Sequence, residues 1–468
     1  MAPRYSFAIP IIVGCAQFMH QFDGSVIATA LPSMAATLHD DPLQLNLAIS
    51  CYLLALAVFV PISGWMASRF GAKRVFTMAI VIFTLSSILC GVSHSLFELV
   101  IARILQGMGG AMMTPVGRLI VVKTAPRADL VKAINYITIP AALAPILGPS
   151  VGGFIVTYLS WPWIFFLNVP IGLAGVLLVR RYIPEVHEEE VPPLDLRGFL
   201  LAAFALASMV FGFESMGRGL LPTSLVIALL TTGAACAALY VYHARRIANP
   251  IIDLSLMRFP TFATSITGGG LFYMGTSSSV FLLAVLLQVG FGLSAFQAGL
   301  TTLAIACGTT TSRFVVRPIL QYVGFKHILI VNACVTGCYL ITCGLFRLTT
   351  PYVLMLGVLF IGGLSRSIQF TATTSLSYAE IPQNLMSRAT SFSALSQQFM
   401  QSFGVGLTAL VVHFSMVASG HSSLAAADLM PGFWAIGAAS LFSMIQFSRL
   451  HAQAGADMGG RGRASEKE

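Results

Sequence analysis

The chain has 468 residues, of which 56% are hydrophobic and only 9% are charged. Soluble domains carry charge on about a quarter of their residues, and a compact globule cannot hide so much apolar surface from water. A soluble enzyme is therefore excluded, and so is a disordered chain, because disorder goes with few apolar residues. The basic residues outnumber the acidic ones, 26 to 17, which in a soluble protein would suggest nucleic acid as a partner.

The apolar sequence divides into segments about as long as the roughly 20 residues that cross a bilayer as a helix. The predicted fold class is therefore an all-α integral membrane protein with fourteen transmembrane helices. The first segment carries His20 and Asp23 and is longer than the apolar part of a signal peptide, so we expect it to remain as a helix. The expected ranges are roughly 7–31, 44–66, 75–93, 96–121, 133–158, 162–182, 198–216, 221–243, 262–288, 296–317, 327–346, 351–377, 389–414 and 430–448.

Two polar stretches divide these helices into groups of six, two and six. Residues 184–197 hold a cluster of glutamates and two adjacent prolines, and residues 245–260 are basic and contain two prolines, so both indicate solvated linkers. The predicted domains are an N-terminal six-helix bundle (1–185), a linker with two extra transmembrane helices (186–260), a C-terminal six-helix bundle (261–450) and a cytoplasmic tail (451–468).

A weak internal repeat supports this division. The turn FGAKRVF at residues 70–76 is similar to VGFKHIL at residues 323–329, with glycines 253 residues apart. Arg103 and Arg366, each deep in a helix, are 263 residues apart. Such similar offsets indicate two homologous bundles, and transporters built from repeats bind their substrate between the halves near the middle of the bilayer.

The basic residues between helices are distributed unevenly. If the amino terminus is cytoplasmic, nearly all of them lie on the cytoplasmic side, and only Arg218 and Arg347 lie outside. The positive-inside rule predicts this for an even number of helices with both termini in the cytoplasm. The net charge of +9 therefore indicates topology, and no nucleic-acid partner is expected.

The sequence offers no candidate for catalysis or metal binding. All eight cysteines fall within the apolar segments without C-x-x-C spacing, so neither a disulfide framework nor a metal site is expected. No phosphate-binding loop, zinc-protease motif or serine-hydrolase motif is present, so ATP does not drive the protein directly and it is not expected to be an enzyme.

Four motifs lie on the predicted helices. Residues 64–74 (GWMASRFGAKR) follow the second helix, and their glycines permit a tight turn while three cations favour an anionic membrane surface. Arg103 lies within LVIARILQGMGG, residues 99–110, in the fourth helix. Residues 144–153 (APILGPSVGG) indicate a kinked, closely packed fifth helix. The first helix ends with residues 23–32, DGSVIATALP.

Together these motifs resemble those of the major facilitator superfamily, specifically its fourteen-helix drug/proton antiporter branch. The resemblance implies a bacterial inner-membrane transporter that works by alternating access and exports its substrate as protons move inward. The proton gradient supplies the energy, and no cofactor is implied. The fifth-helix motif marks antiporters more than importers, so it carries the direction of transport. The residues assigned to gating and conformational change are Gly64, Arg69, Gly71, Lys73, Gly148, Pro149, Gly152 and Gly153.

The chain departs from the family pattern at three positions. Ser68 stands where the loop motif usually has an acid, Ala72 where it has a basic residue, and Ala144 where a glycine opens the fifth-helix motif. Because the usual acid helps to clamp the cytoplasmic side shut through charge pairs, we expect the gate to rely on Arg69, Lys73 and other contacts.

Asp23 is the predicted proton-coupling residue, since a carboxylate in the outer half of the membrane is costly unless it faces water or is neutralised. His20 lies one turn earlier on the same helix face and is a candidate for sharing the proton, although packing is the alternative for both residues. Arg103 is too deep to reach water and must hydrogen-bond to carbonyls or an acid. The resemblance gives it a part in proton coupling, with a structural anchor as the alternative.

Arg366 bears on the charge of the substrate. It lies near the middle of the twelfth helix, so the bundles present Arg103 and Arg366 to the membrane centre against one deep acid, Asp23. An anionic or neutral substrate is therefore expected at least as strongly as a cationic drug, unless surrounding carbonyls and hydroxyls hold Arg366. The other predicted substrate-binding residues, each of which has helix packing as its alternative, are Gln106, Tyr52, Tyr136, Tyr273, Gln369, Gln397 and Gln398.

The leading hypothesis is a proton-coupled exporter of small organic molecules with a multidrug range. The alternative within this class is an exporter of an anionic metabolite, such as citrate or its iron chelate. A transporter-like ligand sensor without net flux is the alternative from another class, and a passive channel is a weaker one. The expected partners are the small-molecule substrate, protons and the lipid bilayer. A monomer is expected, and nothing in the sequence supports a periplasmic adaptor.

Overall fold

The computed structural model describes residues 7–38, 42–185, 191–218, 221–420, 425–451 and 453–455. Residues 186–190 of the predicted linker and most of the predicted tail, 451–468, lie outside the described residues. The α-helices are α1 (Ala8–Leu38), α2 (Pro42–Phe59), α3 (Ser63–Phe70), α4 (Ala72–Gly91), α5 (Leu96–Thr124), α6 (Leu130–Tyr158), α7 (Pro162–Phe166), α8 (Asn168–Tyr182), α9 (Leu196–Arg218), α10 (Thr223–Ala244), α11 (Pro260–Val285), α12 (Ala295–Val323), α13 (Phe325–Gly344), α14 (Tyr352–Leu376), α15 (Met386–Ala418) and α16 (Met430–Ser448).

The predicted all-α membrane fold is confirmed, since the described residues form long apolar helices and no strand. Ten helices among the described residues are long and apolar enough to cross a bilayer, or eleven if the bent pair of α2 and α3 is one span. That pair bends by 58°, and Pro61 at the break lacks the N–H that would continue the helix. The number of fourteen crossings stays a prediction.

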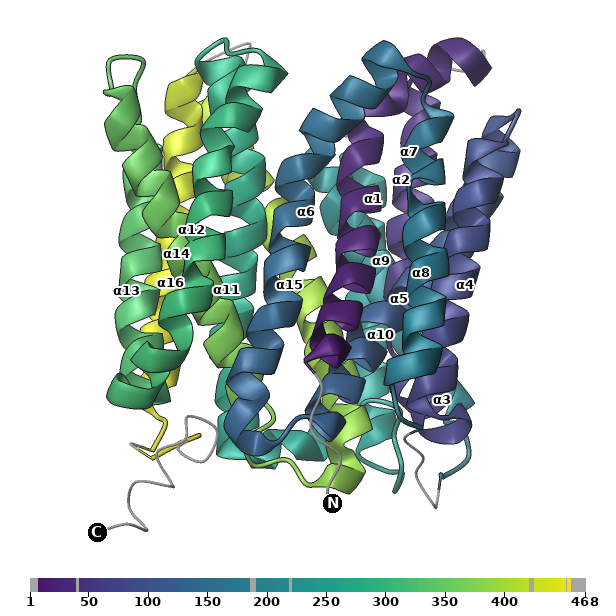
Figure 1. Cartoon of the computed structure of the whole chain (residues 1–468). Helices are drawn as coiled ribbons and strands as arrows, with labels where there is room; N and C mark the ends of the chain where they lie inside the picture. The colour runs from purple at the N-terminus through teal and green to yellow at the C-terminus, as the bar shows by residue number, and fades with distance from the viewer. Residues whose placement is uncertain are drawn as a thin grey trace.

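The helices stand side by side in two groups, with α1–α8 on one side and α11–α14 and α16 on the other (Figure 1). In the N-terminal bundle α1 packs along α6, and α5 packs between α2 and α4, with α8 over α4. In the C-terminal bundle α12 packs on α14, α13 on α16, and α11 on α15 and α16. The bundles meet where α6 contacts α12 and α14, and where α5 contacts α15.

The two inserted helices occupy different positions. α9 contacts α2 of the N-terminal bundle and α15 of the C-terminal bundle, so it covers the seam between them. Phe213 of α9 packs with Phe399 and Phe403 of α15, at ring-centroid distances of 6.3 and 5.1 Å. α10 packs mainly on α9, and most of its surface is not covered by other parts of the protein, as expected for a helix that faces lipid. The predicted boundaries at residues 185 and 260 fall on either side of this pair.

Both turns of the predicted repeat adopt the same backbone conformation. Gly71 separates α3 from α4 with φ 88°, and Gly324 separates α12 from α13 with φ 84°. Residues with a side chain rarely adopt this conformation, so a glycine is required at each turn. The turns lie at the same end of the molecule, which we call the predicted cytoplasmic end.

Candidate functional site

A buried ion pair lies inside the N-terminal bundle. Asp23 of α1 accepts a hydrogen bond through Oδ2 from Nη1 of Arg103 on α5, and both side chains are fully shielded from solvent. The guanidinium also lies 4.0 Å from the ring centroid of Tyr52 on α2. Charges so far from water persist only when they are paired and hydrogen-bonded. Arg103 was expected to face the bundle interior and bond to carbonyls or an acid, and it does both, since its Nε also donates to the Ala48 carbonyl.

Amide and hydroxyl groups complete the shell around the carboxylate. Gln106, one turn after Arg103, donates from Nε2 to Oδ1 of Asp23 at 2.9 Å and to Ser87 Oγ at 2.7 Å. Asn168 donates from Nδ2 to the same carboxylate oxygen at 3.2 Å and to Ser87 Oγ at 3.3 Å. Four helices, α1, α4, α5 and α8, thus converge on one carboxylate, which accepts from three different side chains.

Asn168 lies in the sixth predicted helix, directly after Leu167. The segment is divided at Leu167 into the short α7 and the longer α8, which begins at Asn168. The residue is fully buried because it opens α8 against α1 and α4. Nothing in the sequence around Asn168 gave a reason to place it beside the acid.

His20 connects this network to the centre of the molecule. Its Nδ1 lies 2.5 Å from the hydroxyl of Tyr52, whose ring faces the Arg103 guanidinium. His20 makes no hydrogen bond to Asp23 among the described residues, so direct sharing of a proton between them is not what this conformation shows. It instead lines the central cavity, which makes the histidine and Tyr52 the link between cavity and ion pair.

A cavity of about 100 Å³ lies between the bundles, halfway along the helices. Its described lining includes Arg118 of α5 and Arg366 of α14 but no aspartate or glutamate. Arg118 donates from Nη2 to Gln397 Oε1 of α15 at 2.7 Å, across the seam between the bundles. The other polar and aromatic lining residues are Gln17, His20, Gln21, Thr114, Thr138, Tyr273, Thr276, Thr309, Ser367, Phe370, Gln398 and Gln401.

Arg366 differs from its repeat counterpart Arg103. It lines the central cavity and a smaller space beside it, and no hydrogen bond or ion pair to a described residue holds its guanidinium. Gln369, one turn later, accepts from Asn332 at 2.9 Å inside the C-terminal bundle, as Gln106 bonds inside the other bundle. The repeat therefore preserves an arginine and glutamine pair, whereas no described acid pairs with Arg366 as Asp23 pairs with Arg103.

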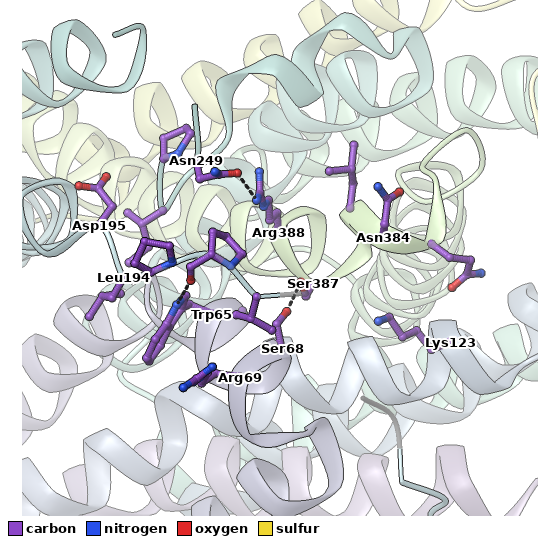
Figure 2. A pocket seen from close by; sticks show the side chains of 18 residues that line it. Trp65, Ser68, Arg69, Lys123, Leu194, Asp195, Asn249, Asn384, Ser387 and Arg388 are labelled. Atoms are coloured by element: carbon purple, nitrogen blue, oxygen red, sulfur yellow. Dashed lines mark hydrogen bonds between the residues drawn. The ribbon is translucent and has the colours of Figure 1, made fainter. Parts of the chain in front are cut away.

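The bundles are joined at the predicted cytoplasmic end by uncharged contacts. Ser63 Oγ of α3 lies 3.0 Å from Ser391 Oγ of α15, and Ser68 Oγ lies 2.7 Å from Ser387 Oγ. Gly64 lies between these pairs, and a Cβ on it would come within 2.7 Å of the Ser387 carbonyl oxygen. Figure 2 shows the Ser68–Ser387 contact at the wall of an open pocket of about 1030 Å³ on this end.

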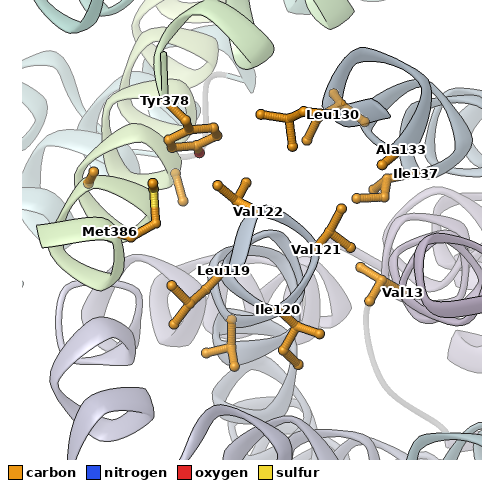
Figure 3. Close-up of a cluster of buried hydrophobic side chains, with 14 of the residues drawn as sticks. Val13, Leu119, Ile120, Val121, Val122, Leu130, Ala133, Ile137, Tyr378 and Met386 are labelled. Atoms are coloured by element: carbon orange, nitrogen blue, oxygen red, sulfur yellow. The ribbon is translucent and has the colours of Figure 1, made fainter. Parts of the chain in front are cut away.

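A cluster of apolar side chains also lies at this end. Figure 3 shows Leu119 and Val122 of α5 and Leu130 of α6 facing Tyr378 and Met386 of the other bundle. All five are buried. The hydroxyl contacts and this cluster together close the predicted cytoplasmic end in the conformation described.

Comparison with known proteins identifies the family. Residues 13–405 match the model of the Major Facilitator Superfamily. The chain belongs to this family. It is 36% identical over 406 residues to the "Putative multidrug resistance protein MdtD" of Escherichia coli O17:K52:H18, covering 86% of this chain and 85% of the relative. The protein of the same name from Salmonella paratyphi A is 35% identical over 402 residues, covering 86% and 85%.

Solved structures of the superfamily have the same fold. The human organic anion transporter MFSD10 aligns with a TM-score of 0.64 at 13% identity, covering 94% of this chain and 99% of that one. The proton:xylose symporter XylE aligns with a TM-score of 0.64 at 15% identity, covering 94% of each chain. The chain is thus a multi-pass membrane transporter of the superfamily and not an enzyme.

The predicted substrate residues of this transporter do not all line the central cavity. Tyr273, Gln397, Gln398 and Arg366 line the central cavity as expected. Four others do not line it in this conformation: Tyr52 and Gln106 belong to the ion-pair network, Gln369 bonds within the C-terminal bundle, and the Tyr136 ring packs 5.7 Å from that of Phe7.

The predicted gating residues lie in two regions, the predicted cytoplasmic end and helix α6. Arg69 is exposed at the cytoplasmic-end pocket, and Lys73 donates to the Arg180 carbonyl at 3.1 Å within its own bundle. At this end the described side-chain hydrogen bonds across the seam come from Ser68 and Ser63, which belong to the other contacts that we expected beside Arg69 and Lys73. In α6, a Cβ on Gly148 would overlap Ser25 of α1, whereas one on Gly153 would meet nothing within 4 Å. Gly152 is buried in the same helix, and the side chain of Pro149 lies outside the described residues.

Arg118, Asn168 and Ser87 are the site residues that sequence reasoning missed. Arg118 carried only a weak signal, because an arginine three residues from the predicted helix end at residue 121 can also reach the membrane surface. Asn168 and Ser87 carried no signal that pointed to Asp23, since serine and asparagine side chains hydrogen-bond between many pairs of transmembrane helices. Among the described residues no three His, Cys, Asp or Glu side chains are placed to hold a metal ion.

Proposed function

We propose that this protein is a proton-coupled exporter of small organic molecules in the bacterial inner membrane, with both termini in the cytoplasm. Protons move inward through the Asp23 site as substrate leaves through the central cavity by alternating access. The observation that carries the proposal is a single carboxylate, buried with Arg103 and joined by Tyr52 and His20 to a cavity between two repeat bundles.

The charge of the cavity favours an anionic or neutral substrate. Arg118 and Arg366 both line it, and no described lining residue is acidic. One Arg118 nitrogen, Nη1, is buried and donates to no described residue. A buried donor without a partner is costly, so a carboxylate or carbonyl oxygen of a substrate would relieve that cost.

A multidrug range that includes lipophilic cations is the second candidate. The printed names of the two MdtD relatives favour it, because they refer to multidrug resistance. The cavity also offers Phe370, Tyr273 and several glutamines, which suit adaptable contacts with molecules of different shape. The two candidates differ in the sign of the substrate charge, which transport measurements distinguish.

The test uses purified protein in liposomes with an acidic interior and a trapped pH-sensitive dye. Citrate, an acidic fluorescent dye and a lipophilic cationic dye are added outside, one at a time. An antiporter takes substrate inward as protons leave, so the lumen becomes more alkaline. We expect this response from wild type and its loss in Asp23→Asn. No response to any of the three probes, or an unchanged response in Asp23→Asn, would overturn the proposal.

Substrate charge is tested with Arg366→Ala in the same liposomes. We expect the response to the anionic probes to fall at least tenfold while any response to the cationic dye persists. Arg347→Ala is the matched control, because Arg347 is exposed on the loop between α13 and α14, away from the cavity. Equal responses to anions and cations in Arg366→Ala would refute the charge argument.

A further inference from the structure

We infer that Asn168 is a positioning residue that lets the buried Asp23 carboxyl exist both with and without its proton. The inference rests on the proposed function, because it concerns how the same site loads and releases H⁺. It assigns a role to a side chain that lies at the break between α7 and α8, away from every motif on which the family resemblance depends.

The hydrogen bonds of the described state are those of an ionised carboxylate. Both Asp23 oxygens only accept: Oδ2 from Arg103, and Oδ1 from Gln106 and Asn168. A protonated carboxyl must instead donate one hydrogen bond from its O–H. The buried site therefore needs an acceptor that is free when the proton arrives, or the O–H remains unsatisfied at considerable cost.

The acceptors around Asp23 are already engaged, with one exception. Gln106 Oε1 accepts from Arg103 at 2.5 Å, and Ser87 Oγ accepts from both Gln106 and Asn168. Asn168 Oδ1 is buried and has no hydrogen-bond partner among the described residues. It is the acceptor that the ionised state leaves unused.

An amide can exchange its two ends without moving its neighbours. The oxygen and the NH₂ group of asparagine have nearly the same size, so a half-turn of the amide places Oδ1 where Nδ2 stands. Nδ2 lies 3.2 Å from Asp23 Oδ1, so after the half-turn the amide oxygen is in range of the carboxyl O–H. In either orientation one end of the amide serves Asp23, so the amide itself stabilises both the ionised and the protonated carboxyl, while Arg103 and Gln106 stabilise the ionised form.

The other titratable groups near Asp23 cannot replace this function without losing bonds of their own. Arg103 only donates. The Tyr52 hydroxyl is engaged with His20, and the Cys90 thiol lies 3.7 Å from Gln106 Oε1. Asn168 is therefore the side chain that can change from donor to acceptor at the smallest structural cost.

The test measures the protonation of Asp23 directly, without transport. Infrared difference spectra of purified protein are recorded as the pH is lowered. A protonated carboxyl gives a C=O band, and the band that is present in wild type but absent in Asp23→Asn is assigned to Asp23. In Asn168→Leu, Arg103 and Gln106 still serve the ionised form, whereas the protonated form loses its acceptor. We expect the protonated fraction at a given pH to fall about tenfold.

The matched control is Asn135→Leu. Asn135 is also a buried asparagine whose Oδ1 has no partner in the described part of the chain, but it lies on α6 outside the Asp23 shell, so the band should be unchanged. Asn168→Ala gives the same prediction with a smaller side chain if the leucine variant does not fold. A protonated fraction that rises in these variants would show that the amide acts only as a donor, and an unchanged fraction would show no role; either result overturns the inference.

The outcome also separates this inference from the proposed function. If the wild-type band changes with pH and the Asn168 variants behave like wild type, the Asn168 inference fails and proton loading at Asp23 stands. If the wild-type protein shows no band that depends on Asp23, both fail together.

Discussion

Replacing Gly64 by alanine should open the predicted cytoplasmic end. A Cβ at this position would lie 2.5 Å from Ser391 Oγ and 2.7 Å from the backbone oxygen of Ser387. A hydroxyl can rotate away, but a helical carbonyl cannot, so α3 and α15 must separate by roughly 0.7 Å to restore an ordinary contact. Close packing at this point is therefore incompatible with any side chain.

The magnitude follows from the hydrogen bonds that this separation breaks. The Ser68–Ser387 and Ser63–Ser391 hydroxyl distances, 2.7 and 3.0 Å, would both exceed the usual limit of about 3.0 Å. Each bond contributes about 0.5–1.5 kcal/mol, so the closed conformation loses about 1–3 kcal/mol. That range agrees with the usual cost of overpacking a well-packed contact. It corresponds to a shift of about 5- to 150-fold towards conformations open at this end.

The assay is the distance between spin labels on opposite bundles at this end. Phe70 and Asn384 are exposed on α3 and on the loop before α15, and labels are attached there in a background without the eight native cysteines. We expect Gly64→Ala to increase the population of long distances. Gly153→Ala is the matched control, because its Cβ meets nothing within 4 Å. A distance distribution in Gly64→Ala equal to that of wild type would refute the steric argument.

Two further predictions concern the same contacts and the ion pair. Ser68→Ala should raise the population of long label distances by about 2- to 10-fold, because one hydroxyl bond is lost. The distance distributions of wild type and Ser68→Ala should be the same at low and high salt, because the hydroxyl bond to Ser387 carries no net charge. Arg103→Leu should lower the free energy of unfolding by about 3–5 kcal/mol, because Asp23 is left buried without its partner. Replacing both residues by leucine should cost less than that single change, as thermal unfolding in detergent would measure; an equal or larger cost would contradict the account of the pair.

The sequence was sufficient for the all-helical membrane fold and for placing Asp23 and Arg103 inside the bundle. Apolar segments of membrane-spanning length can hardly be anything but helices in lipid, where every backbone group must be bonded within its own segment. Asp23 and Arg103 lie on different helices, yet each is too costly alone in an apolar bundle, so their pairing follows from energetics once the bundle is assumed. Gln106 follows from Arg103, because residues three apart share a helix face.

The sequence could not predict in the same way which side chains point into the cavity. Transmembrane helices are apolar on nearly every side, so the periodic pattern that shows which face is buried in a soluble protein is weak. Tyr136 and Gln369 were consequently assigned to a cavity that they do not line. The Arg118–Gln397 contact joins residues 279 positions apart in different bundles, and it depends on how the bundles approach each other in this conformation.

The sign of the coupling between substrate and proton distinguishes the two substrate candidates. Binding is reciprocal, so a ligand that changes the proton affinity of Asp23 has its own affinity changed by the same factor when Asp23 is protonated. An anion held by Arg118 and Arg366 would favour the protonated carboxyl, whereas a cation would favour the ionised one. Only a cationic substrate can therefore displace the proton from Asp23 by its charge. Exchange of an anionic substrate for protons must instead be enforced by the conformational change between the two access states. Added citrate should therefore strengthen the carboxyl band of Asp23 at fixed pH if the substrate is anionic, and a band weakened by citrate would contradict the assignment of these arginines to an anion.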